Sequence, residues 1–93
     1  MRYEWDQKKA AANFAKHRVS FAMARDTFRD LLAVVKIDDR EDYGEERLIR
    51  TAMVGDRLLV VCYSEHHDGH DEIIRIISAR KANRHERHTY EEG

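Results

Sequence analysis

The sequence predicts a single α+β domain in which helices cover one face of an antiparallel sheet. Its 93 residues have the length of one domain, and no linker, repeat or low-complexity run divides them. Apolar residues recur at helical spacing up to about residue 30 and at strand spacing after it. Short connections with turn signals separate the strands, and consecutive strands joined in this way pair as an antiparallel meander.

The first part of the chain predicts a short strand followed by two helices. Residues 2–5 alternate between charged and aromatic side chains, which is typical of a strand. Asp6 is a favourable N-cap for a helix over residues 7–17, whose alanines supply an apolar side. Ser20 is placed to begin a second helix, in which apolar residues recur three and four positions apart.

The rest of the chain predicts four strands and a final helix. The strands are expected at residues 31–37, 46–54, 58–63 and 72–79, and the helix at residues 81–91. Gly55-Asp56 is typical of a tight hairpin turn, and residues 64–71 are expected to form a loop around Asp68-Gly69. The predicted order of elements is therefore β-α-α-β-β-β-β-α.

Composition excludes several classes of protein. With 42% hydrophobic and 38% charged residues, the chain is not disordered, and its longest apolar stretch, Leu58 to Tyr63, is far shorter than the ~20 residues of a membrane-spanning helix. The N-terminus has no apolar export signal. The single cysteine, Cys62, is expected to be a buried thiol in a reducing cytoplasm. No phosphate-binding glycine loop, dinucleotide motif or serine-hydrolase elbow is present.

The net charge of −1 conceals two patches of opposite sign. Residues 38–46 contain six acids and one arginine. Residues 75–87 contain five lysine or arginine residues and one glutamate. A cationic patch binds phosphate even on a protein that is neutral as a whole, so the basic C-terminal segment is the first candidate for a functional site.

Two arginines of this segment stand out by their positions. Arg75 lies within an otherwise apolar strand, on the same face as Ile73 and Ile77. It is either at an edge or paired with a carboxylate, or it points into a cleft on the sheet. Arg80 follows the strand, where loops commonly hold working residues. The planar fork of arginine suits phosphate because it donates two parallel hydrogen bonds.

Two further candidates lie outside the basic segment. Lys16 and His17 end the first helix; they either stabilise its C-terminus, or His17 serves as a general acid or base. Glu46 and Arg47 begin a strand; they either belong to a solvated, salt-bridged edge, or the carboxylate faces an arginine of the basic segment across the sheet.

The histidines do not predict a metal site. His66, His67 and His70 share one segment, and His85 and His88 lie one helical turn apart. No cysteine accompanies them, and no second element offers ligands at a convincing spacing. They are expected to be solvated.

A series of motifs runs through the chain in a fixed order. The motifs are Glu4-Trp5-Asp6 with Lys9-Ala10, Asn13 and Lys16-His17; Val19-Ser20-Phe21 with Ala24, Phe28 and Asp30; Gly44-Glu45-Glu46-Arg47; Leu58-Leu59-Val60-Val61 with Tyr63; and Ile74 to Ala82 with Glu86-Arg87 and Tyr90. In this order, and over nearly the whole chain, they resemble the BrnT toxins. Two positions depart from the family: Arg18 stands where glycine is usual, and Leu31 where proline is common.

The resemblance to BrnT implies a RelE-like fold and the toxin of a type II toxin–antitoxin system, with residues 1–93 as one toxin domain. Such a toxin is a ribonuclease that needs no metal or other cofactor, cleaves RNA in the cytoplasm and stops translation. Its partner is expected to be a BrnA-like ribbon-helix-helix antitoxin. The two would form a hetero-oligomer that reaches operator DNA only through the antitoxin.

The resemblance and the positions of the residues suggest roles in RNA cleavage. Arg75 and Arg80 are expected to hold the phosphate with help from Lys16, and His17 or Glu46 to move the proton. The residues expected to bind RNA around the site are Arg47, Lys81, Arg84 and Arg87. Two alternatives remain: a module that docks RNA or an acidic protein on its basic surface without cleavage, and a histidine-based metal protein.

Overall fold

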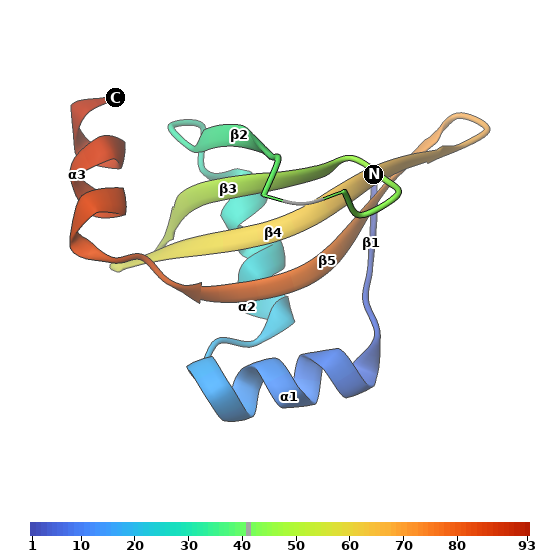
Figure 1. Cartoon of the computed structure of the whole chain (residues 1–93), viewed down its shortest axis with the longest axis horizontal. Helices are drawn as coiled ribbons and strands as arrows, with labels where there is room; N and C mark the ends of the chain where they lie inside the picture. The colour runs from blue at the N-terminus through green and yellow to red at the C-terminus, as the bar shows by residue number, and fades with distance from the viewer. Residues whose placement is uncertain (41) are drawn as a thin grey trace.

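The computed structural model describes residues 1–40 and 42–93, which form a five-stranded sheet, three α-helices and one 3₁₀ turn (Figure 1). In chain order the elements are β1 (Arg2–Glu4), α1 (Gln7–His17), α2 (Phe21–Asp26), the 3₁₀ turn (Thr27–Arg29), β2 (Val34–Asp38), β3 (Arg47–Val54), β4 (Arg57–Asp68), β5 (Asp71–Lys81) and α3 (Arg84–Glu92). The α+β class and the predicted order of elements are confirmed. None of the described helices is long and apolar enough to cross a bilayer.

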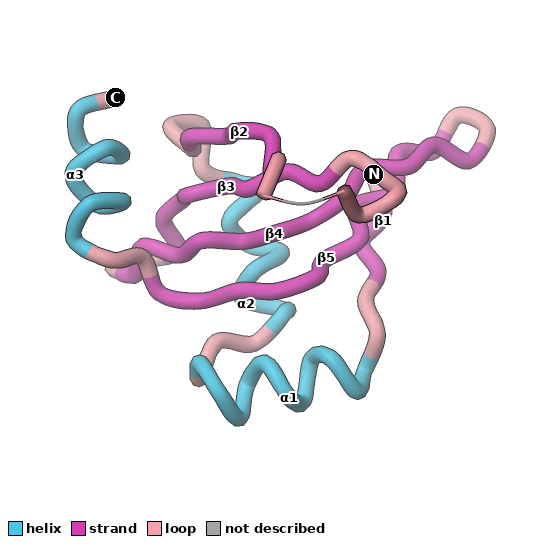
Figure 2. The backbone as a smooth tube through the Cα atoms, viewed as in Figure 1, coloured by secondary structure: helices cyan, strands magenta, loops and turns pink. Residues whose placement is uncertain are grey.

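The sheet has the strand order β1-β5-β4-β3-β2, so β1 and β2 form its two edges (Figure 2). Strands β2 to β5 form the predicted antiparallel meander. β1 pairs with β5 in parallel, which makes the sheet mixed. The sequence did not predict this pairing, because a strand of three residues has too short a side-chain pattern to specify its partner.

Helices α1 and α2 cover one face of the sheet, and the other face stays largely open, with α3 at one end of it (Figure 1). The core lies between the sheet and these two helices. Its buried residues are Val19, Phe21, Ala24, Leu59, Val61, Tyr63, Ile74, Ile76 and Ala79. Strand side chains that alternate with these core residues point to the open face.

Asn13 joins α1 to the sheet. Its buried side chain donates from Nδ2 to the carbonyl oxygens of Val19 (3.0 Å) and Ala79 (2.8 Å), and its Oδ1 accepts from the Ala79 amide (3.1 Å). β1 extends along β5 only as far as Arg75, so the outer backbone of β5 beyond this point has no strand partner. Asn13 supplies hydrogen bonds there and protects this edge of the sheet.

β4 and β5 are longer than the sequence predicted. Their ladder continues almost to the turn at Gly69, whose φ of +64° lies in the left-handed region. The prediction of a loop at residues 64–71 was therefore wrong. Pairing with the first part of β5, which includes Ile73 and Ile74, holds this polar segment in strand conformation, which its own composition did not predict.

Candidate functional site

Four of the cations on the open face of the sheet come from its β2, β3 and β5 side chains and the loop after β2, and we call the surface that they form the cationic face. They are Lys36 of β2, Arg40 of the loop that follows, Arg47 of β3 and Arg80 of β5. The strand register supports this placement, because Lys36 is paired with Ile49 and Arg80 with Val60. Ile49 and Val60 line the cavities on the open face. The cationic face therefore brings together residues from distant parts of the sequence.

Arg80 is held by a carboxylate. Its Nη1 and Nη2 donate to Oε1 and Oε2 of Glu86 at 2.8 and 2.7 Å. Hydrogen bonding to Arg80 lowers the pKa of Glu86, and hydrogen bonding to Glu86 raises the pKa of Arg80, so both groups are charged at neutral pH. The Arg80 side chain is nevertheless 41% exposed, which leaves it accessible to a ligand.

Glu86 also begins α3. Its Oε1 accepts from the backbone amide of Asn83 at 2.8 Å, and the Asn83 side chain accepts from the amide of Glu86 at the same distance. These reciprocal hydrogen bonds form a capping box. The carboxylate that orients Arg80 is thus itself fixed by the start of the helix.

Arg40 is oriented by Asp38, whose side chain is fully buried. Arg40 donates from Nε and Nη2 to the two carboxylate oxygens, each at 2.7 Å. Hydrogen bonding from Arg40 holds the pKa of Asp38 well below its usual range, so the carboxylate stays charged. The Arg40 side chain is 67% exposed, so its charged group is accessible from the solvent on the cationic face.

A small cavity of about 60 Å³ lies between the two arginines. Its lining residues are Arg40, Ile49, Val60, Cys62, Ser78 and Arg80. Cys62 is free and buried, as predicted, and burial raises the pKa of its thiol, so the thiol is uncharged at neutral pH. Two guanidinium groups above an uncharged floor favour the binding of an anion.

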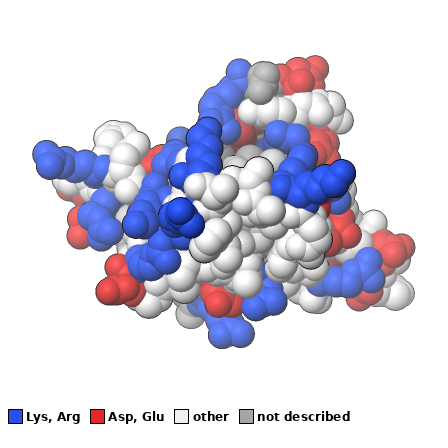
Figure 3. Space-filling view, turned by 90° about the horizontal axis from the view of Figure 1, so that it is seen from below, with Lys and Arg blue, Asp and Glu red and all other residues white. Residues whose placement is uncertain are grey.

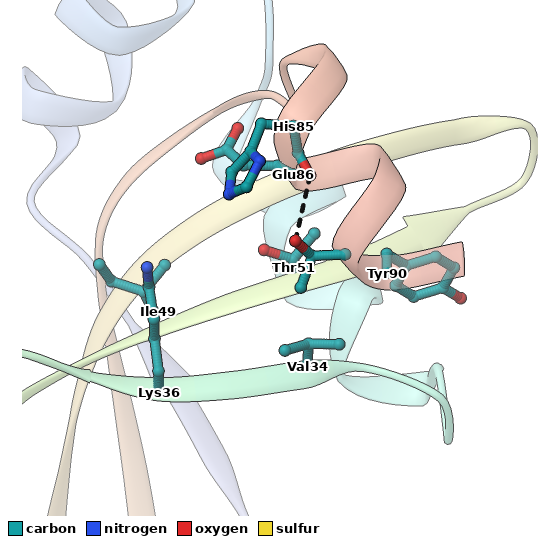
Figure 4. A pocket seen from close by; sticks show the side chains of 8 residues that line it. Val34, Lys36, Ile49, Thr51, His85, Glu86 and Tyr90 are labelled. Carbon is teal, nitrogen blue, oxygen red and sulfur yellow. Dashed lines mark hydrogen bonds between the residues drawn. The ribbon is translucent and has the colours of Figure 1, made fainter. Parts of the chain in front are cut away.

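A larger cavity of about 180 Å³ lies beside the first one, between the sheet and α3 (Figure 4). Its lining residues are Val34, Lys36, Ile49 and Thr51 of the sheet, and His85, Glu86, Thr89 and Tyr90 of α3. Ile49 lines both cavities, so the two are neighbours. The Tyr90 hydroxyl donates to Oδ2 of Asp30 at 2.6 Å, which fastens the end of α3 and raises the pKa of Tyr90 to about 12.

Arg75 is paired with a carboxylate, which is one of the alternatives that the sequence left open. Its Nη1 lies 3.3 Å from Oε1 of Glu4 on the neighbouring strand β1. The strand register places Arg75 on the open face, opposite Ser64. A β-bulge lies between Arg75 and Arg80, whose partners Ser64 and Val60 are four positions apart on β4, which is about 13 Å at ~3.3 Å per residue. The two arginines would therefore contact different phosphates.

Lys16 and His17 lie in the last turn of α1, which runs beside β5 (Figure 1). The side of the molecule that α1 occupies carries lysine and arginine side chains around an uncharged area (Figure 3). The side chains of Lys16 and His17 have no hydrogen-bond or ion-pair partner among the described residues. The structure does not join Lys16 or His17 to the group around Arg80, and their roles stay predictions.

The other predicted residues are spread over two regions. Glu46 is exposed and forms no ion pair with a described residue, whereas Oε1 of the neighbouring Glu45 lies 3.7 Å from Nε of Arg47. The Arg47 guanidinium lies 4.0 Å from the centre of the Tyr43 ring. The remaining three residues, Lys81 at the end of β5 and Arg84 and Arg87 in α3, are exposed.

Lys36, Arg40 and Glu86 were not among the predicted site residues. Arg40 is the lone base of an acidic segment, and the pair Asp38-x-Arg40 was the local signal for its orientation. Asn83-x-x-Glu86 is the pattern of a capping box, which could have placed the start of α3 next to the end of β5. Lys36 had no local signal, because its position depends on which strands pair.

The histidines make protein contacts of their own. His66 Nε2 lies 3.0 Å from the hydroxyl of Ser64, and His88 Nε2 lies 3.1 Å from a carboxylate oxygen of Glu92. The part of the chain that the structure describes contains no group of three or more His, Cys, Asp or Glu side chains arranged to hold a metal ion. Metal independence nevertheless remains a prediction, which activity measurements must test.

Asp38→Asn is expected to make the stability of the protein less sensitive to acid. Because the folded state lowers the pKa of Asp38 below its ordinary value of 3.8, the ionised carboxylate stabilises the fold above that value. This contribution is lost as the pH falls below the ordinary value and through the lowered pKa. Between about pH 6 and about pH 2, urea midpoints should therefore fall more steeply for the wild type than for the variant. Parallel curves would mean that Asp38 has no such effect.

Comparison with known families agrees with the resemblance of the motifs. A sequence model of the family described as ribonuclease toxin, BrnT, of type II toxin-antitoxin system matches residues 5–86 of the chain. The matched region includes the four residues of the cationic face and Glu86. No curated protein matches the chain.

Proposed function

The chain belongs to the BrnT family of ribonuclease toxins of type II toxin–antitoxin systems, and we propose that it cleaves RNA on the cationic face without a metal ion. The observation that supports this site best is the geometry of Arg80. Its fork already holds two carboxylate oxygens of Glu86, and a phosphate can present two oxygens in the same way. Arg40 lies across the small cavity from it.

The reaction needs no group outside the chain and the RNA. A base takes the proton of a 2′-hydroxyl, the 2′-oxygen bonds to the adjacent phosphorus, and the bond from phosphorus to the 5′-oxygen breaks. An acid protonates the leaving 5′-oxygen. The products are a 2′,3′-cyclic phosphate and a 5′-hydroxyl end. Negative charge grows on the phosphate oxygens between these steps, where Arg80, Arg40 and Lys36 would stabilise it.

The proton-transfer groups nearest to Arg80 belong to α3. Glu86 is ionised at neutral pH and can accept a proton once the phosphate has taken its place on Arg80. His85 lines the larger cavity together with Glu86, and it can serve as the acid that protonates the leaving 5′-oxygen (Figure 4). His17 and Glu46 stay as candidates that would need the RNA to bridge the distance to Arg80.

The remaining predicted cations would guide the RNA and not act on the scissile bond. Arg75 would contact a phosphate further along the RNA, because about 13 Å separate it from Arg80. Arg47, whose guanidinium group lies over the Tyr43 ring, would add a flat cationic group on which a base can stack. Lys81, Arg84 and Arg87 would extend the positive surface around the junction of β5 and α3.

A toxin of this family implies an antitoxin partner. We propose a BrnA-like ribbon-helix-helix antitoxin that forms a hetero-oligomer with the toxin, covers the cationic face and binds operator DNA. The free toxin, with its RelE-like fold, would then cleave RNA and stop translation in the cytoplasm.

Cleavage of labelled RNA by the purified protein tests the proposal. We expect cleavage at the same rate with and without a chelator such as EDTA, because the stabilising charges belong to side chains. RNA that is bound but not cut would support a binding module in place of an enzyme. Loss of cleavage with EDTA, restored by added metal, would contradict the metal-free mechanism.

A further inference from the structure

β2 is an edge strand with an open side. It pairs with β3 on one side, and it ends the strand order of the sheet on the other (Figure 2). The outward backbone N–H and C=O groups of Val34–Asp38 therefore have no partner strand among the described residues. Such an edge can accept one more strand from another chain.

The side of β2 away from the cationic face is apolar and exposed. Val35 and Ile37 are 44% and 59% exposed. Leu31 and Leu32, in the turn that leads into β2, are 98% and 75% exposed. We call these four residues the β2 apolar strip. They are four of the six large hydrophobic residues that are exposed in the described part of the chain, so the strip is a concentration of apolar surface and not a scattered background.

The other side of β2 belongs to the cationic face. Lys36 points to the same side as Ile49 and lines the cavity beneath α3. It forms no ion pair with any described residue. Successive residues of β2 thus present apolar side chains to one side of the edge and the ammonium group of Lys36 to the other.

We propose that an extended segment of the antitoxin pairs with β2 as a sixth strand, with acidic residues on the side of Lys36 and apolar residues on the side of Val35 and Ile37. A strand places alternate side chains on opposite faces, so one segment can satisfy both sides at once. The acidic residues would lie at the rim of the cationic face and compete there with RNA phosphates. This inference rests on the proposed function, because it makes strand addition the means by which the ribonuclease site is covered.

A second copy of the chain fits this edge less well. Antiparallel pairing of two copies centred on the middle residue of β2 places Lys36 opposite Lys36 of the other copy, and like charges directly opposite destabilise a sheet. An acidic segment turns the same position into an attraction. In this register, charge complementarity favours an acidic partner over a second copy of the chain.

Hydrogen exchange on the toxin–antitoxin complex tests the inference. The chain is co-expressed with a BrnA-like ribbon-helix-helix antitoxin, and backbone exchange is compared between the purified complex and the free chain. Exchange of the outward amides of residues 34–38, which do not face β3, should slow by more than about 10-fold in the complex, because strand pairing protects amides that the free edge exposes. A complex in which these amides exchange as in the free chain would overturn the inference.

Two matched variants separate this edge from other surfaces. Val35→Asp combined with Ile37→Asp should fold, because both positions are exposed, and should lower antitoxin binding by at least about 10-fold. Phe14→Asp on α1, where Phe14 is 45% exposed, should leave binding within about twofold. If Phe14→Asp lowered binding and the β2 double variant did not, the antitoxin would dock on α1 and not on β2. RNA cleavage by the free chain is measured separately, so a failure of the edge inference is distinct from a failure of the ribonuclease proposal.

Discussion

Arg80→Ala is expected to lower the rate of RNA cleavage by about 10²–10³-fold, which is the usual effect of removing one preorganised donor from a transition state. The reason is the bidentate geometry at the small cavity, which Arg80 lines from β5 and Arg40 from the loop after β2, so that Arg40 does not supply the donors that Arg80 places there. Single-turnover cleavage of labelled RNA measures the effect, with circular dichroism as the check on folding. In cells, the same variant should no longer arrest growth.

Arg75→Ala is the matched control for this prediction. Arg75 has the same exposed fraction as Arg80, 41%, and it also forms an ion pair with a glutamate. Since it lies about 13 Å away along the sheet, its removal should weaken RNA binding a few-fold and leave the rate of cleavage in the bound complex nearly unchanged. If the two variants lose activity equally, the site extends along the whole strand. A folded Arg80→Ala variant with full activity would exclude Arg80 from the mechanism.

Asn13→Ala is expected to lower the free energy of unfolding by about 2–4 kcal/mol, because it leaves three buried backbone groups without their hydrogen bonds. For a domain of this size, such a loss corresponds to a fall in Tm of roughly 10–25 °C. The expected cause is specific: α1 loses its attachment to the backbone of Ala79, and the outer edge of β5 is uncovered. Thermal unfolding followed by circular dichroism measures it.

Ala12→Ser provides the control on the same helix. Ala12 is exposed, and its replacement should cost about 0.5 kcal/mol or less, the difference in helix propensity. A similar loss of stability in both variants would mean that α1 is sensitive to any substitution. The hydrogen bonds of Asn13 would then not be the reason for the stability of this edge.

The sequence predicted correctly those features of the helices and turns that depend only on neighbouring residues. Asp6 and Ser20 accept hydrogen bonds from the first turns of α1 and α2, as their N-cap positions predicted. Gly55 has a φ of +60° in the two-residue turn between β3 and β4, as the Gly-Asp pair predicted. The far half of the β4–β5 ladder was missed, because its strand conformation comes from pairing and not from its own residues.

The site was predicted only in part. Its residues come from different strands, and the register of the sheet and the length of the side chains decide which of them meet. Arg80 was found from its position at the end of an apolar strand, and Arg75 was recognised as needing a partner, which is Glu4. Lys36 and Arg40 could not be joined to Arg80 from the sequence, since 40 or more positions separate them from it and only the order of strands brings them together. Glu86 is only six positions from Arg80, and its capping-box pattern was the sequence signal for the start of α3.

The ends of the RNA fragments produced in the presence of EDTA test the central claim most directly. Attack by the 2′-hydroxyl under the control of protein side chains leaves a 2′,3′-cyclic phosphate on one fragment and a 5′-hydroxyl on the other. We expect these two ends from the wild-type protein and almost no product from Arg80→Ala. A 5′-phosphate end would show that water attacked the phosphorus, and it would contradict RNA cleavage by the 2′-hydroxyl on the cationic face.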